Sequence, residues 1–387
     1  MSTSAKLNPN ILRIKKCLIE FLIFTFLIYC IYFPVTKRLF IGTALSQNIL
    51  LMIICLVSFA ILIMSPNFRS PSKVLIVIPI IASFSAIVTQ SAFSLFRLIS
   101  WILFCLGMSQ LPSNYSYLNL MFRISKFFVL MGLLTIPFSQ LSFYSDTRFP
   151  LTFFNQRLTG IDSYSNALGV LSGFLFIYSL YLKPKHYRLY IILSFLVTYL
   201  TETRSVLIVI FSSFTFRLLF LKSLSISDFF KSLTSLSFFS YLFFRFLVFP
   251  YFSQFSNLNQ VDDRSAVWLI PWKVWKEQKL TGYGFSWYEN FPEQFQIAGV
   301  VNPHNSYLNL LVTSGLIGFI FFAVAVIRYV FLCLRSNDPF LMNTLLFLLI
   351  VGFTEPCIEF SFGNESSVLF LLFFTHLRTY RNIPDLK

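Results

Sequence analysis

The chain is rich in apolar residues and poor in charged ones. Hydrophobic residues fill 56% of its 387 positions and charged residues only 12%, with a mean hydropathy of +0.74. A soluble domain carries about a quarter charged residues, so the composition excludes an ordinary water-soluble protein. The net charge of +15 would suit a nucleic-acid binder, but the Lys and Arg residues are scattered at the ends of apolar runs rather than gathered on one face. Nucleic acid is therefore not the expected partner.

Apolar runs of about twenty residues recur along nearly the whole chain, which is the length that crosses a bilayer as a helix. They predict an all-α polytopic membrane protein with about twelve transmembrane helices in one integral-membrane domain over residues 1–387. The first run has no small-residue cleavage site and others follow it, so we expect a retained helix rather than a signal peptide. The predicted helices start near Leu18, Ser46, Val74, Phe93, Met121, Tyr164, Tyr187, Arg204, Leu233, Asn305, Phe340 and Ser366.

Basic residues mark alternate loops, and the positive-inside tendency places those loops and both termini in the cytoplasm. Two longer segments then fall outside, one from about Gln140 to Ser163 and a large extracytoplasmic loop from about Tyr251 to Pro303. The residues that set this orientation are Lys6, Arg13, Lys15, Lys16, Arg69, Lys73, Lys183, Lys185, Arg188, Arg217, Lys222, Lys231, Arg328, Arg335, Arg378, Arg381 and Lys387.

The large outer loop contains the stretch DDRSAVWLIPWKVWKEQKLTGYGF. Three tryptophans recur in it at helical spacing, with lysines beside them. They are Trp268, Trp272 and Trp275. Tryptophan and lysine together suit the lipid headgroup layer, which predicts an interfacial helix kinked near Pro271. Arg264 precedes these tryptophans and follows two acids, Asp262 and Asp263. A local ion pair with these acids and a role in substrate binding are both open for Arg264.

The stretch NPHNSYLNLLVTSGLIGF begins with polar residues and turns apolar, and it holds one of only three histidines. Asn302 is the predicted N-cap, Pro303 the first helical residue, and His304 part of the first turn on the outside. Such a helix start favours neutral imidazole, which is a usable general base, and can hold a phosphate oxygen. A solvated surface histidine is the alternative. One helical stripe, with glycines that admit a neighbouring helix, is expected over His304, Leu308, Leu311, Gly315 and Gly318.

Arginines are also expected at other outer positions. In TETRSVLIV, Arg204 falls in the first turn of a helix, where it opposes the helix dipole. That placement indicates either an anionic partner or snorkelling toward headgroups. Arg157 lies in the other outer segment, in FNQRLTGIDSYSN. Together with Arg264 and His304, these residues would give one face several cations and one base, which suits a diphosphate substrate.

With these stretches in view, the chain resembles the superfamily of O-antigen ligases and O-antigen polymerases. The family's histidine motif is met by His304 and Asn305, followed after nine residues by GxxG at Gly315 and Gly318; Leu308 also meets the HNxxL form. The stretches TETRSVL and DDRSAVWLIPWKVWKEQKLTGYGF resemble the family's outer arginine segments. The resemblance runs from Arg157 onward, while the first helices agree only in hydropathy.

This resemblance implies a membrane glycosyltransferase of the GT-C kind in the bacterial inner membrane, with its site facing the periplasm. It would transfer a glycan from a polyprenyl diphosphate carrier to a sugar hydroxyl of a glycan or lipid acceptor, with inversion and without a metal or other cofactor. His304 would act as the base, and Arg204 and Arg264 as the clamp on the diphosphate. Arg157 would be a weaker third cation. The complete histidine motif favours a ligase slightly over a polymerase.

Two further residues enter through the resemblance. Asn305 is expected to contact substrate beside the histidine. Glu355, in FTEPCIEF, resembles an acidic position of the ligases and could orient His304. A buried helix-end acid paired with a surface cation explains Glu355 nearly as well.

Two other classes of function compete with this one. A solute transporter could use intramembrane arginines along its path, at Arg97, Arg123 and Arg245, but each lies near a span end, where snorkelling explains it. Transporters also tend to show broken helices in matched halves, and no such pairing is visible. A partner subunit without catalytic activity is disfavoured because the histidine motif is intact.

The charge pattern makes a topological prediction. Single cysteines that replace Asn257 and Asn302, in a background without reactive native thiols, should both be labelled by an impermeant maleimide in intact cells, because both positions fall outside. If either position is labelled only after lysis, the predicted orientation is wrong, and so is the proposal of a catalytic site on the outer side.

Overall fold

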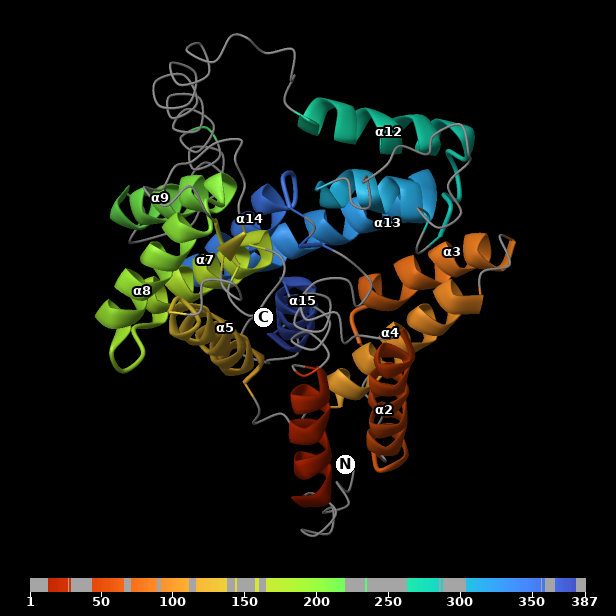
Figure 1. Ribbon diagram of the computed structural model, residues 1–387, viewed down its shortest axis with the longest axis horizontal. Coiled ribbons are helices and arrows are strands. Elements are labelled where there is room, and N and C mark those ends of the chain that lie inside the picture. Colours follow the sequence, from red (N-terminus) through yellow and green to blue (C-terminus); the bar gives the residue numbers. More distant parts are fainter. Residues whose placement is uncertain are drawn as a thin grey trace.

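We describe a computed structural model of the chain, in which α-helices form nearly all the regular structure (Figure 1). The structure describes residues 13–26, 28, 44–65, 71–88, 92–110, 116–137, 143–144, 157–159, 165–219, 234, 263–284, 287, 304–355, 357–358 and 366–380. A first helix covers 13–26, and the others are α2 (Ala44–Ile63), α3 (Val74–Val88), α4 (Ala92–Ser109), α5 (Tyr117–Leu134), α7 (Ser165–Leu182), α8 (Tyr187–Leu200), α9 (Arg204–Leu219), α12 (Asp263–Glu277), α13 (Ser306–Ser336), α14 (Pro339–Val351) and α15 (Ser366–Tyr380). Two short strands, β1 (Phe143–Tyr144) and β2 (Arg157–Leu158), pair antiparallel.

The all-α prediction is confirmed, and each predicted helix within the described residues is present close to its expected start. The helix expected from Leu233, and most of both long outer segments, lie outside the described residues. Some helices are shorter than predicted, with 14 residues in α8 and 13 in α14. By length and hydropathy, three described helices could each cross a membrane, namely Tyr117–Leu134, Ser165–Leu182 and Ser306–Ser336.

Helix α7 lies at the centre of the second half of the bundle, where it packs against α5, α8, α9, α14 and α15 (Figure 1). Two of its glycines admit neighbours very closely. A Cβ on Gly169 would lie 2.1 Å from Thr203 Oγ1, and one on Gly173 would lie 2.5 Å from Val206 Cγ1 and 2.8 Å from Phe347. These missing side chains let the start of α9 and the C-terminal half of α14 press against the same helix.

Buried hydroxyls join α7 to α8 and to the turn that leads into α9. The hydroxyls of Ser172 and Thr198 lie 2.7 Å apart, and Thr201 Oγ1 donates to the Thr198 carbonyl at 2.9 Å. Thr203 Oγ1 donates in turn to Thr201 Oγ1 at 3.0 Å. These bonds satisfy polar groups inside an apolar bundle, so they fix the turn that precedes Arg204.

Several segments that the charge pattern places in the cytoplasm lie together. Arg378, near the end of α15, donates to the carbonyl of Pro71, in the segment before α3. The neighbouring Ser72 shares a hydrogen bond with Tyr329, in the second half of α13. Because these segments were assigned to one side by their charges alone, their meeting agrees with the predicted orientation.

Helix α13 is interrupted at Gly315, whose backbone angles are φ 63° and ψ −169°. The prediction of one continuous stripe from His304 to Gly318 is therefore wrong. The group that approaches Gly315 is the backbone of Leu280, in the loop after α12, and not a neighbouring helix. Gly318 instead accommodates the side chain of Ser314 within α13 itself. A conformation with this φ and ψ is available almost only to glycine, which is why the helix breaks there.

Candidate functional site

The three candidate arginines stand at the starts of three elements. Arg204 is the first residue of α9, as predicted, and Arg264 is the second residue of α12. Arg157 opens β2, opposite Tyr144 of β1. The side chains of these arginines lie outside what the structure describes. Strand β2 packs against α8, the helix whose end leads through the turn to Arg204.

His304 does not lie in the first turn of α13, so that prediction is wrong. The N-cap is Asn305, whose side-chain oxygen accepts from the N–H groups of Tyr307 and Leu308, both at 3.0 Å. His304 precedes the cap, has a positive φ of 47°, and is half-buried. Asn is among the best N-caps, and here it begins the helix three residues later than Asn302 would.

The sequence suggested that the N-terminus of α13 could hold a phosphate. The structure shows that its backbone donors are already used. The N–H of Ser306 donates to the carbonyl of Gly352 at 2.8 Å. The N–H groups of Tyr307 and Leu308 are taken by the side chain of Asn305. The donors that a bound anion would need are thus already used, so any phosphate near His304 must be held by side chains.

Ser306 ties the start of α13 to the segment after α14. Its hydroxyl donates to the carbonyl of Glu355 at 2.7 Å and accepts from the N–H of Ile358 at 2.9 Å. Ser306 is fully buried, and Glu355 is only 2% exposed. The backbone of Glu355 is therefore bonded to Ser306, which follows His304 by two residues in the chain. That Glu355 orients His304 remains a prediction. Sequence reasoning missed Ser306, although it sits in the HNS stretch beside the candidate base.

Helix α14 connects the His304 segment with the start of α9. On one side, Tyr307 donates its hydroxyl to the carbonyl of Leu349 in the C-terminal half of α14. On the other, Phe347 packs with Val206 against Gly173 of α7. The elements that begin with Arg204 and follow His304 are therefore assembled around one end of α14.

Helix α12 lies along the first part of α13 (Figure 1). It is continuous through Pro271. Trp272 is exposed, its ring centroid lies 4.8 Å from that of Trp275 in a tilted arrangement, and Lys276 Nζ lies 5.7 Å from the ring of Trp272. An aromatic and cationic outer face is thus present, and its place in the headgroup layer stays a prediction.

Tyr283, in the loop after α12, is not a candidate for a second base. Burial, and then the negative charge of Glu277, raises the pKa of the Tyr283 phenol, so this phenol stays protonated at neutral pH. Within the described ranges, no three His, Cys, Asp or Glu side chains gather as metal ligands would.

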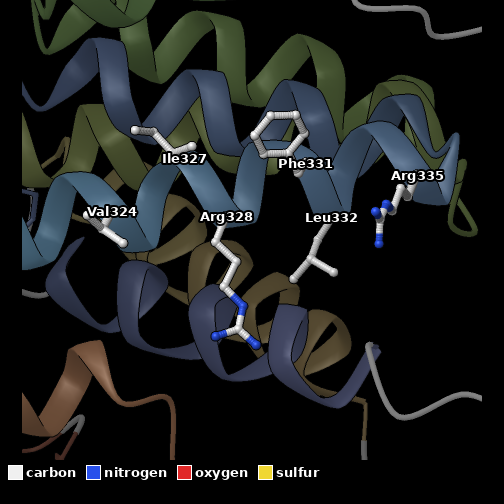
Figure 2. Close-up of a pocket in the computed structure, with 6 residues that line it drawn as sticks. All are labelled: Val324, Ile327, Arg328, Phe331, Leu332 and Arg335. Carbon is white, nitrogen blue, oxygen red and sulfur yellow. The ribbon is translucent and has the colours of Figure 1, made fainter.

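An apolar hollow with two arginines lies on the second half of α13, toward the end opposite His304 (Figure 2). No histidine or carboxylate is among its lining residues, which are Val324, Ile327, Arg328, Phe331, Leu332 and Arg335. Arginines above apolar side chains at a predicted cytoplasmic helix end suit contact with lipid. This hollow is not the candidate catalytic site.

An apolar helical bundle that includes helices long enough to cross a membrane defines a class, the helical membrane proteins. Residues 189–323, about a third of the chain, match the family model described as O-antigen ligase. The chain therefore carries an O-antigen ligase family domain across these residues, and the resemblance is confirmed. No curated protein matches the chain.

The matched segment runs from α8 into the first half of α13. It includes Arg204, Arg264 and His304, whereas Arg157 and Glu355 lie outside it. Members of this family are integral-membrane enzymes of the O-antigen ligase or polymerase type, which act on lipid-linked glycans in surface-polysaccharide assembly.

Replacement of Ser306 tests the link between α13 and the segment after α14. Ser306→Ala should destabilise the protein by about 1–3 kcal/mol, because it leaves the buried N–H of Ile358 without its acceptor. Thermal unfolding in detergent measures the loss. Ser336→Ala is the matched control, since Ser336 also makes two hydrogen bonds in α13 but is only partly buried. Equal losses in both variants would contradict a special role for Ser306.

Proposed function

We propose that the chain is an inverting glycosyltransferase of the bacterial inner membrane, with its active site facing the periplasm. It moves a glycan from polyprenyl diphosphate to an acceptor sugar hydroxyl, and it does so without a metal ion. The observation that carries this proposal is the O-antigen ligase family domain over the segment that contains His304, Arg204 and Arg264.

His304 is proposed as the general base. It lies outside the regular helix and is only half-buried, so its ring can be reached by a substrate hydroxyl. The imidazole takes the acceptor proton while the acceptor oxygen attacks the anomeric carbon. The bond from that carbon to the diphosphate oxygen breaks on the opposite face, which inverts the configuration.

The leaving group is a diphosphate, whose negative charge must be offset as the bond breaks. Because the N–H groups at the start of α13 are occupied, backbone donors there cannot supply this charge. Guanidinium groups can, since each presents two donors to phosphate oxygens in a fixed fork. Arg204 and Arg264 are the proposed clamp, and Arg157 is a third cation from the strand beside α8.

The two remaining substrate-binding candidates, Asn305 and Glu355, differ in which of their groups are available to contact a substrate. The side-chain oxygen of Asn305 is used in the helix cap, so its amide nitrogen is the group left to contact a sugar. Glu355 is buried, and its backbone is held by Ser306. We propose that Glu355 acts on His304 rather than on substrate.

The acceptor separates a ligase from a polymerase, and we favour the ligase because the complete histidine motif is present and the matching family is described as O-antigen ligase. A polymerase of the same superfamily would use the same outer chemistry. A deletion strain distinguishes them by its surface glycans. A single repeat unit left on the acceptor indicates a polymerase, whereas long chains stranded on the carrier lipid indicate a ligase.

The break in α13 is a feature that also occurs in transporters, where broken helices line a substrate path. Here the break is filled by the backbone of the loop after α12. Among the described helices, α13 is the one whose interior is interrupted in this way, so no matched pair is present there. The transporter alternative is therefore weaker than the glycosyltransferase.

His304→Ala should abolish glycan transfer while membrane insertion stays intact, because this residue precedes the helix and is only half-buried. Transfer by the unchanged protein should also fall as the outer pH drops below about 6, where a free imidazole takes up a proton. Both are measured with purified donor in nanodiscs.

The matched control is His186→Ala. His186 also has a positive φ, of 66°, and precedes a helix, but it lies on the predicted cytoplasmic side. If the His304 variant keeps most of its transfer rate, His304 is a surface histidine and not the base.

Arg204→Lys and Arg264→Lys should each lose most of the transfer activity at unchanged expression. Lysine keeps the charge but loses the fork, so a clamp fails where a snorkelling residue would tolerate the change. The double variant should be little worse than either single one, because both residues act on one leaving group.

Arg188→Lys is the control for these variants, since Arg188 is an exposed arginine on the predicted cytoplasmic side. Near-normal rates in both single variants would mean that Arg204 and Arg264 are membrane anchors. The diphosphate charge would then have to be offset by other residues.

A further inference from the structure

The break in α13 frees backbone groups that an unbroken helix would pair with each other. In a regular helix, each N–H bonds to the carbonyl four residues earlier. Beyond Gly315, the N–H of Leu316 instead donates to the carbonyl of Lys279 at 2.8 Å, and that of Ile317 donates to the carbonyl of Leu280 at 3.2 Å. Both acceptors belong to residues 279–284, which we call the docked loop.

The carbonyls freed on the other side of the break also bond to the docked loop. The carbonyl of Val312 accepts from the N–H of Tyr283 at 2.7 Å, and that of Thr313 accepts from the N–H of Gly284 at 2.9 Å. The two donors and two acceptors that the break exposes are therefore all satisfied by one short segment. This pairing allows a helix to be interrupted inside an apolar protein.

Two glycines bring the two backbones into contact. A Cβ on Gly315 would lie 2.1 Å from the carbonyl oxygen of Leu280. A Cβ on Gly282 would lie 2.5 Å from both the nitrogen of Gly315 and the carbonyl oxygen of Val312. Both glycines have a positive φ, of 63° and 69°. No side chain fits at either position without separating the loop from the helix.

Side chains on both sides of the docked loop extend the contact. Ile270 and Val274 of α12 are buried together with Val312 and with Trp287, which follows the loop. Trp287 also donates its indole N–H to the side chain of Asn309 in α13 at 2.9 Å. Helix α12 and the loop are thus attached to α13 before, within and after the break.

We propose that Gly282 and Gly315 are positioning residues, which dock the loop into the break and so fix α12 over the helix that follows His304. Arg264, at the start of α12, then keeps a constant place relative to His304. The inference rests on the proposed function, because it assigns the two glycines a task in bringing clamp and base together. It also explains the first glycine of the GxxG pattern by a backbone contact rather than by helix packing.

A disulfide tests the docking directly. Leu280 and Ile317 are adjacent through a backbone hydrogen bond and are 61% and 48% exposed, so cysteines should be tolerated at both positions. In a background without native thiols, the Leu280→Cys/Ile317→Cys protein should form a cross-link on mild oxidation, seen as a linked peptide by mass spectrometry. Leu280→Cys with Val324→Cys is the control pair, since Val324 is equally exposed, at 61%, but lies about two turns further along α13.

Transfer is then measured on the oxidised and the reduced protein. If the docked state is the active one, the cross-linked enzyme should keep its kcat within twofold of the reduced enzyme. A loop that must leave the break during turnover would instead make the oxidised enzyme inactive, with recovery on reduction. That result would overturn the proposal.

Gly282→Ala and Gly315→Ala, placed in the same cysteine background, should lower both the cross-linking rate and kcat by tenfold or more. The acid limb of the pH profile should not move, because the base itself is unchanged. Gly132→Ala in α5 is the control, since its Cβ would meet no backbone atom but the side-chain end of Leu168, at 3.0 Å. It should leave both readouts within twofold.

The outcomes separate the two levels of inference. Glycine variants that cross-link poorly but transfer normally would overturn the positioning role. Normal cross-linking in those variants would overturn the need for the two glycines in docking, and failure of the Leu280→Cys/Ile317→Cys parent to cross-link would overturn the docking itself. A Leu280→Cys/Ile317→Cys protein that cross-links as expected, while neither it nor the unchanged protein transfers glycan, would contradict the proposed glycosyltransferase and leave the docking confirmed.

Discussion

Backbone polar groups inside an apolar protein must find partners within the protein, and the first half of α13 is arranged around that requirement. At the start of α13, Asn305 and the carbonyl of Gly352 take the N–H groups of the first turn. At Gly315, the docked loop takes the groups that the break releases. Each solution attaches a different outer segment to the same helix. Helix α13 therefore acts as the support on which the candidate site is built.

This arrangement decides which groups remain for chemistry. A helix N-terminus often binds phosphate, but the one beside His304 has already used its donors. Among the described residues near the start of α13, the candidate groups for chemistry are a half-buried imidazole, the amide nitrogen of Asn305 and the buried Glu355 held through Ser306. The charge of a diphosphate leaving group must then come from arginines on other elements. A site of this kind depends on how accurately separate elements are held together, since no single element carries both base and clamp.

Glycines illustrate why residue type alone does not reveal its purpose. Gly169 and Gly173 of α7 serve helix packing, as small residues in membrane helices commonly do, because they admit the start of α9 and a ring from α14. Gly315 was expected to serve the same purpose in α13. It serves another, because its φ of 63° interrupts the helix and lets the carbonyl of Leu280 approach. Both kinds of glycine look alike in a hydrophobic run.

The sequence by itself determined the class of protein, the places of its helices, and the presence of a histidine and arginines at predicted outer ends. Those features are local. Hydropathy is summed over one run of residues, and the turn before Arg204 is so short that Arg204 must fall in the first turn of the next helix. Tertiary structure decided the rest. Asn305 became the cap because Ser306 is held by Glu355 and Ile358, about fifty residues later in the chain. The break at Gly315 is possible only because the docked loop supplies four bonding partners from about thirty to forty residues earlier. Such partners are set by packing between distant segments, and no pattern within one stretch of sequence specifies them.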